Sequence, residues 1–233
     1  MILIACGLQR EAKILGRPGV ITVPGGGDAA RLEAMLEAQT PGATMVVSSG
    51  IAGALDPALM AGDIVIHLPT PFVPSEVEGR ARSAAPGTRP STALGANGSW
   101  KHRLKAALPN ARQGTIIGQD RIAATAAEKA ALYAATGALA VDMESHVAAR
   151  VAARYGLPFL AIRAISDTAH ETLPPAALVG MNPDGSMALG KVLASLARRP
   201  GQLPALIRTG RSAEAAFTSL AQLSQALRLT QQN

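Results

Sequence analysis

The sequence predicts an α/β fold: a single domain on a mixed, mostly parallel central sheet flanked by helices. Three observations predict it. Short apolar runs recur along the chain, segments of helical periodicity separate them, and 48% of the 233 residues are hydrophobic. Only 3% are aromatic, so the core is built from aliphatic side chains. This composition excludes a disordered chain, and the single cysteine excludes an internal disulfide and a multi-cysteine zinc site.

Seven apolar runs have the length and composition of strands: residues 2–6, 19–23, 44–48, 63–67, 114–117, 138–141 and 159–166. Between them, Asp28 is placed to cap a helix, and further helices are expected over residues 124–135 and 145–155. Buried strands joined by helices favour a largely parallel sheet. Ligands bind such sheets at the carboxyl ends of the strands. Functional residues are therefore expected in the segments that follow the strands: residues 7–11, 24–28, 48–55, 142–145 and 166–170.

Residues 71–98 break this pattern. They are rich in proline, glycine, serine and arginine and show no helical or strand periodicity. The peptides PFVPSEVEG and PSTALGANG at the two ends can be encoded by nearly complementary codons, which indicates an inverted repeat in the gene. We expect an inert surface insertion, because the entropy of closing a loop grows slowly with its length. The alternative is a lid or binding loop.

The formal net charge of +6 first suggests a nucleic-acid partner. However, residues 191–233 hold six basic residues against one acid, so most of the charge lies in a basic helical C-terminal end, and no nucleic-acid partner is expected. Five apolar residues recur there at helical spacing: Ala213, Phe217, Leu220, Leu223 and Leu227. This stripe either docks on the core or gives a peripheral contact with an anionic membrane surface. With no basic leader and no run of ~20 apolar residues, a cytoplasmic location is expected.

The first segment whose residues suggest a binding site is VVSSGIAGALDPALMAGDIVI, from Val46 to Ile66. It reads as a strand, a glycine-rich turn and a second strand. Backbone N–H groups around Ser48, Ser49 and Gly50 can approach an anion or a sugar closely. The alternative is that the glycines only permit a tight turn.

The second stretch is ALAVDMESHVAARVAARYGLPFLAIRAISDTA, from Ala138 to Ala169. Glu144 follows one strand and Asp167 ends another, so the two carboxylates are expected to converge on one crevice. The alternative from spacing alone is that they cap helices or pair with arginines.

The motifs SGIAGALDPALMAGDIV, VDMES and IRAISDTA resemble the purine and uridine phosphorylase superfamily, which includes the methylthioadenosine and adenosylhomocysteine nucleosidases. The resemblance runs from Met1 to about Ala169, apart from the insertion. Gly7-Leu8 with Glu11-Ala12, and the segments TGALAVDMESHVAA, LPPAALVGMNPDG and RRPGQLPALIR, resemble the hopanoid-associated phosphorylases. That subfamily is linked to cleavage of adenine from adenosylhopane. The resemblance implies a three-layer α/β/α nucleoside phosphorylase-like enzyme, a nucleoside substrate with an apolar 5′ group, and a homo-oligomer.

The resemblance also implies site residues. Asp167 is the general acid at purine N7, a role that needs a pKa raised by burial, and Ser166 orients it. Glu144 binds the ribose diol and Met143 packs against the sugar. Glu11 resembles the glutamate that activates water; its alternative is a charge favoured at a helix start. Four more residues are assigned to the nucleoside pocket: Ser49, Gly50, Asp120 and Arg121.

Whether water or phosphate attacks stays open at this stage. Three phosphate-binding candidates are named: Arg10, Gly26 and Ser48. Phosphate would be a co-substrate, and neither a cofactor nor a metal is expected, since the four histidines lack ligand spacing. Arg163 is expected to form a structural ion pair. Two alternative functions remain, a methylthioadenosine or adenosylhomocysteine nucleosidase and a catalytically idle nucleoside-binding scaffold; Ile51 departs from the nucleosidase pattern.

Overall fold

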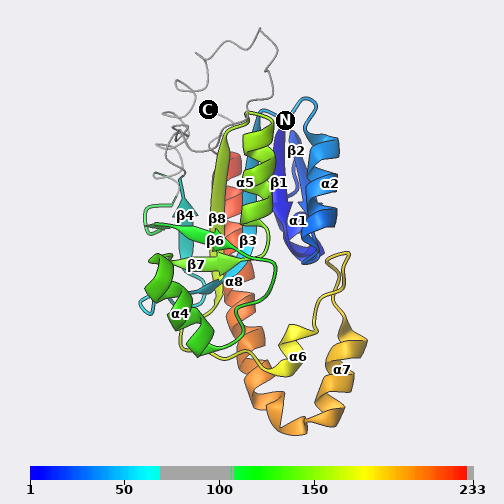
Figure 1. Ribbon diagram of the computed structural model, residues 1–233, viewed down its shortest axis with the longest axis vertical. Helices are drawn as coiled ribbons and strands as arrows, with labels where there is room; N and C mark the ends of the chain where they lie inside the picture. Colours follow the sequence, from blue (N-terminus) through cyan, green and yellow to red (C-terminus); the bar gives the residue numbers. More distant parts are fainter. Residues whose placement is uncertain (69–105, 107, 230–233) are drawn as a thin grey trace, which may run out of the picture.

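The computed structural model of the protein describes residues 1–68, 106 and 108–229 (Figure 1). The segment expected to be an insertion, residues 71–98, lies outside the described residues.

The described residues form one eight-stranded sheet. Its strands are β1 (Ile2–Cys6), β2 (Val20–Pro24), β3 (Met45–Ala54), β4 (Ile64–His67), β5 (Arg112–Gln113), β6 (Ile116–Gly118), β7 (Ala140–Asp142) and β8 (Phe159–Asp167). The main order is β2-β1-β3-β8-β4-β5, with β7 paired to β3 and β6 paired to β7. Pairs β3–β7 and β4–β8 are antiparallel and the others are parallel. The predicted mixed, mostly parallel sheet is confirmed.

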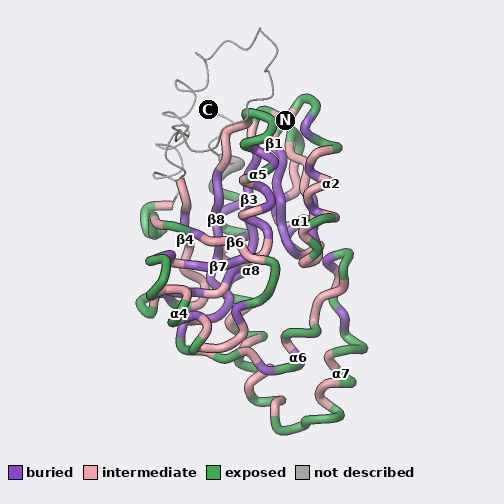
Figure 2. The backbone as a smooth tube through the Cα atoms, in the orientation of Figure 1, coloured by how far each residue is buried: buried purple, intermediate pink, exposed green. Residues whose placement is uncertain are grey.

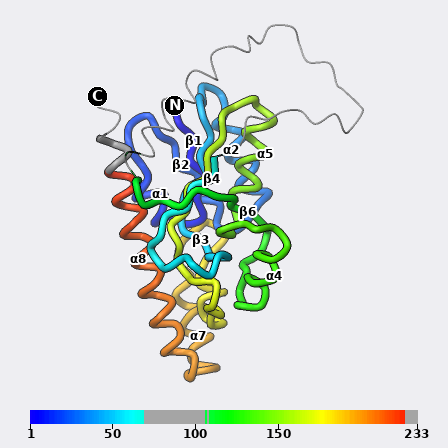
Figure 3. Tube along the Cα trace, turned by 90° about the vertical axis from the view of Figure 1, so that its left-hand side faces the viewer, coloured from blue at the N-terminus to red at the C-terminus, as the bar shows by residue number. Residues whose placement is uncertain are grey.

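Helices cover both faces of this sheet (Figures 1 and 3). They are α1 (Gln9–Leu15), α2 (Ala29–Gln39), α4 (Ala126–Thr136), α5 (Ser145–Arg154), α6 (Pro175–Leu178), α7 (Leu189–Arg198) and α8 (Leu203–Leu229), with a short 3-10 turn at Pro200–Gln202. Alternate residues of β1 face opposite cores: Ile4 packs with α1 and α8, and Leu3 packs with α2 and α5. Asp28 caps α2 as expected, because its side chain accepts the backbone N–H of Arg31 at 2.9 Å.

The prediction of a glycine-rich turn at residues 48–55 is wrong. Strand β3 continues through this segment to Ala54. It pairs with β8 from Val46 to Gly53, with one irregularity between Ala52 and Gly53, so the ladder hydrogen bonds hold the glycines in an extended chain. These glycines therefore lie inside the central strand of the sheet, directly beside β8.

The C-terminal helix has two parts. In its second half, Leu220 and Leu223 of the predicted stripe are buried against the sheet beside Ala216, so this part of the stripe docks on the core. The side chain of Leu227 lies outside the described residues. The first half of α8 projects beyond the sheet with α6 and α7 (Figure 1). None of the described helices has both the length and the apolar character that crossing a membrane requires.

Candidate active site

A cavity of about 740 Å³ lies between the carboxyl ends of β7 and β8, helix α1 and the α6–α8 extension. Five acidic residues line it, and three of them were named as site residues from the sequence: Glu11, Glu144 and Asp167. The expectation that Glu144 and Asp167 converge on one crevice is therefore confirmed. All three are at least nine-tenths buried, so their charges act in a medium of low polarity.

Glu11 is held by backbone N–H groups from two elements. Its Oε2 accepts the N–H of Gly7 and of Leu8, both at 2.8 Å, and its Oε1 accepts the N–H of Ile51 at 2.7 Å. The anion that approaches the β3 backbone is thus a carboxylate of the protein itself. Burial raises the pKa of Glu11, and these hydrogen bonds oppose the rise. The result is a fixed carboxyl group with a raised affinity for a proton.

Arg163, at the centre of β8, is the fully buried cation of this cluster. Its Nε donates to Asp142 at 2.6 Å, which confirms the expected ion pair. Its Nη2 donates to Ser48 Oγ at 2.6 Å and to Ser145 Oγ at 3.2 Å. Its Nη1 has no hydrogen-bond partner among the described residues. One donor of a buried guanidinium is therefore free to bind something else.

Glu144 lies at the edge of this ion pair, 3.4 Å from Nη2 of Arg163. Burial raises the pKa of Glu144 to about 8; the charges of Asp142 and Glu11 add to the rise, and Arg163 opposes it. At neutral pH the carboxyl group is mostly protonated, so it both donates and accepts hydrogen bonds. That combination suits a diol. Met143, the neighbouring residue, also lines the cavity.

Asp167 has a cationic partner that the sequence reasoning missed. Its Oδ1 accepts the hydroxyl of Ser166 at 2.7 Å, and its Oδ2 forms an ion pair with Lys129 of α4. Lys129 is fully buried and also donates to the backbone oxygens of Thr168, at 2.8 Å, and Glu171, at 3.0 Å. All three ammonium protons therefore have acceptors.

Three glycines make room for these carboxyl groups. A Cβ atom at Gly7 would lie 2.8 Å from Glu144 Oε1, and one at Gly53 would lie 3.0 Å from Asp167 Oδ2. At Gly50 it would lie 2.6 Å from Glu11 Oε1 and 2.8 Å from the unpartnered Nη1 of Arg163. The in-strand glycines are therefore explained by close approach rather than by a turn.

Three other pocket residues named from the sequence do not line the cavity. Ser49 is buried next to Gly50, and neither lines the cavity. The side chain of Asp120 is 79% exposed and contacts His146 at 2.8 Å, whereas its neighbour Arg121 does line the cavity.

The three phosphate candidates are not brought together. Ser48 is fully buried beneath Arg163. Gly26 donates its backbone N–H to the carbonyl of Gly7 and does not line the cavity. Arg10 lines the cavity at the surface and forms an ion pair with Glu214. The described residues offer no cluster of free cations at the buried end.

The far end of the cavity is apolar. Helices α6, α7 and α8 and the loops beside them supply aliphatic, thioether and aromatic walls: Leu173, Met181, Met187, Leu189, Leu206 and Phe217. Within residues 1–68, 106 and 108–229, no three histidine, cysteine or acidic side chains are grouped as a metal site requires. The cavity thus joins a carboxyl-rich end to an apolar end.

Comparison with known proteins places this geometry among related folds. The family model described as "Phosphorylase superfamily" matches residues 8–198. A 5′-methylthioadenosine/S-adenosylhomocysteine nucleosidase of Mycobacterium tuberculosis is 32% identical over 164 residues, 59% of this chain and 64% of that protein, so the match spans under two thirds of that relative. A futalosine hydrolase of Streptomyces coelicolor is 30% identical over 173 residues, 71% of this chain and 67% of that protein.

Two solved structures show the same fold. The S-adenosylhomocysteine nucleosidase of Streptococcus pyogenes, in complex with 5-methylthiotubericidin, superposes with a TM-score of 0.56 at 21% identity, covering 95% of this chain and 94% of that one. The native futalosine hydrolase of Helicobacter pylori gives a TM-score of 0.52 at 17% identity, covering 95% and 96%.

Proposed function

The chain belongs to the phosphorylase superfamily, and from this premise we propose that it cleaves the N-glycosidic bond of a 5′-substituted adenosine and releases adenine. The proposed substrate is adenosylhopane, which would place the enzyme in hopanoid biosynthesis. One observation carries the proposal: a single cavity joins the buried carboxyl groups to apolar walls from α6, α7 and α8.

Asp167 is the proposed general acid. When the C1′–N9 bond breaks, its electron pair moves into the purine, and a proton delivered to N7 makes the base a better leaving group. Asp167 would supply that proton and regain one from solvent before the next turnover. Ser166 and Lys129 hold its two oxygens, so the carboxyl group has one orientation in the cavity.

The carboxyl cluster supports the sugar half of the reaction. As the bond opens, positive charge develops on the ribose ring. The carboxylates of Asp142 and Glu11 outnumber the single cation Arg163 in this region, so the local field favours an oxocarbenium-like sugar. Glu144 would bind the ribose hydroxyls, and Met143 would pack against the ring.

We propose water as the nucleophile. Glu11 lines the cavity, so its carboxyl group can accept a hydrogen bond from a water bound there. Glu11 would take a proton from this water while its oxygen bonds to C1′. The buried carboxyl groups would repel a phosphate dianion, and the phosphate candidates are apart.

The apolar end of the cavity supports a large 5′ group. Met187 and Leu189 line it and are also 62% and 63% exposed, so the cavity opens to the surface between apolar side chains. A long hydrocarbon substituent can therefore extend outward without being fully enclosed. The relative from M. tuberculosis supports the second candidate, a nucleosidase for methylthioadenosine or adenosylhomocysteine, whose 5′ groups are small or polar.

We further propose that the protein acts as a homo-oligomer with peripheral membrane contact. The proposal of an oligomer rests on the family resemblance. Light scattering of the purified protein over a range of concentrations tests it. The membrane contact is argued from the surface below.

The test is an adenine-release assay on adenosylhopane and on methylthioadenosine, each with and without phosphate. We expect adenine without phosphate and no acceleration when phosphate is added. Formation of a 5′-substituted ribose 1-phosphate would show that phosphate, and not water, is the nucleophile. Absence of adenine from every reaction would overturn the proposed activity, and the variant Asp167→Asn serves as the blank.

A further inference from the structure

We propose that the exposed surface of α7 and the start of α8 docks on an anionic lipid bilayer. This surface, the apolar-basic face, is defined by apolar Met187, Leu189, Leu193, Leu203 and Ile207 together with basic Lys191, Arg198, Arg199, Arg208 and Arg211. The proposal goes beyond the reaction, because it concerns a partner that the catalytic cavity does not need in order to work.

The apolar part of this face is not covered by the protein. Leu193 is 65% exposed, and Leu203 and Ile207 are each 47% exposed. In α7, apolar residues recur at helical spacing, yet no residue of α7 is buried (Figure 2). An amphipathic helix normally buries its apolar stripe against a core. In α7, some apolar side chains line the cavity and others face solvent. The solvent-facing side chains can therefore contact another apolar surface.

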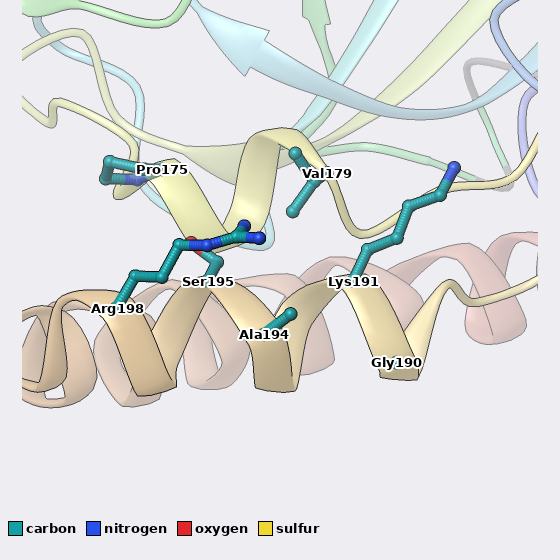
Figure 4. Close-up of a pocket in the computed structure, with 7 residues that line it drawn as sticks. All are labelled: Pro175, Val179, Gly190, Lys191, Ala194, Ser195 and Arg198. Carbon is teal, nitrogen blue, oxygen red and sulfur yellow. The ribbon is translucent and has the colours of Figure 1, made fainter.

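Basic residues are interspersed with these apolar residues along the same segment of the chain. Between Asp184 and Glu214 the chain carries five basic residues and no acid, and all five are exposed. Figure 4 shows Lys191 and Arg198 reaching from α7 over a second cavity of about 450 Å³ beside α6. Exposed cations and exposed apolar side chains in one segment match the two components of an anionic membrane surface, the headgroup charge and the acyl boundary.

The face also contains the mouth of the site cavity, through Met187 and Leu189. Docking would therefore bring the mouth against the bilayer. If the proposed function is right, a nucleoside with a hydrocarbon 5′ group could pass from the lipid into the cavity without crossing water. This consequence rests on the proposed function, whereas the docking itself does not.

A second copy of this chain fits the face less well. A two-fold interface brings the same patch of both subunits together. Five cations would then meet five cations with no acid between Asp184 and Glu214 to offset them. Such an interface would also close the cavity mouth.

Vesicle flotation of the full chain tests the proposal. Phosphatidylcholine vesicles are compared with vesicles that also contain phosphatidylglycerol, at low and at high salt. We expect binding to the anionic vesicles that weakens as salt rises. The variants Arg199→Glu/Arg208→Glu and Leu193→Ser/Leu203→Ser should each weaken binding by about tenfold or more. The matched controls Arg112→Glu and Tyr155→Ser change exposed residues outside the face and should bind as the wild type does.

Release of adenine from a water-soluble 5′-substituted adenosine, measured in parallel, shows whether each variant is folded. Loss of vesicle binding with this activity unchanged supports the proposal. Equal binding by the wild type and the two face variants overturns it. A concentration-dependent dimer that both face variants disrupt, without any vesicle binding, also overturns it and assigns the face to a second copy.

Discussion

Lys129 Nζ and the carboxylate of Asp167 form a buried ion pair between the first turn of α4 and the end of β8. The lysine is 38 residues from its partner in the sequence and fully buried in the fold. Its two other protons bind backbone oxygens of the loop after β8. A group proposed to protonate the base is thus fixed in place by a cation that has no other role in the cavity.

Lys129→Met should lower the free energy of unfolding by about 3–5 kcal/mol, because it leaves a buried carboxylate without its cation. Lys129→Arg should retain part of that stability. Asp167→Asn should also destabilise, and the double variant should lose less than the sum of the two single losses. Urea unfolding of the four proteins gives the values; strictly additive losses would show that the pair is not an energetic unit.

Glu11→Gln should reduce kcat by about 10²–10⁴-fold with a small change in KM, because it removes the proposed base and leaves the nucleoside contacts intact. Steady-state adenine release measures both constants. The control is Glu33→Gln, which changes an exposed salt bridge between α2 and α5 and should keep wild-type kcat. A large rise in KM with kcat preserved would assign Glu11 to binding instead.

The free energy of unfolding should fall as pH rises from about 4.5 to about 8. Burial raises the pKa of Glu144 from an ordinary 4.5 to about 8, so in this window the folded protein holds a proton that the unfolded chain has released. Below the window both states are protonated, and this contribution is fully present. Glu11, whose pKa is also raised, acts in the same direction.

Glu144→Gln tests the source of this dependence. In this variant the free energy of unfolding should decline less between about pH 4.5 and about pH 8 than it does in the wild type. The decline that remains should be the contribution of Glu11. Urea unfolding at each end provides the comparison. A decline as steep as that of the wild type would mean that Glu144 does not hold the proton.

Gly50→Ala should destabilise the protein by about 1–3 kcal/mol and reduce kcat, because the added Cβ would clash with Glu11 and Arg163, whose side chains are held in place by hydrogen bonds. Gly190→Ala is the matched control: nothing lies within 4 Å of its added Cβ, and alanine favours the helix. Thermal unfolding and adenine release separate the two variants. Wild-type activity in Gly50→Ala would show that the cluster is not tightly packed.

The strands and the acidic residues could be predicted because their signals are local. Seven apolar runs mark strands that the structure contains, and Glu144 and Asp167 stand at the ends of two of them. Residues 48–55 were expected as a turn because glycine is rare inside strands. The glycines in this segment leave space for Glu11, Arg163 and Asp167. That requirement depends on contacts from elements far along the chain, so the local sequence does not indicate it.

Lys129 and the apolar-basic face could not be found in the same way. Lys129 follows a capping box of Thr125 and Glu128 in an alanine-rich helix, where a lysine is ordinarily exposed. Its burial depends on the loop from Thr168 to Glu171. The apolar stripe predicted from the sequence lies in the second half of α8, where Leu220 and Leu223 pack against the core. The exposed apolar residues lie instead in α7, where Leu189 and Leu193 are exposed.

The most direct measurement is the ratio of kcat/KM for adenine release from adenosylhopane to that from methylthioadenosine, with both substrates in the same detergent and without phosphate. The apolar walls of α6, α7 and α8 predict a ratio of about tenfold or more in favour of adenosylhopane, because they bury hydrocarbon that the smaller substrate lacks. A ratio near one, or one that favours methylthioadenosine, would contradict the proposed substrate.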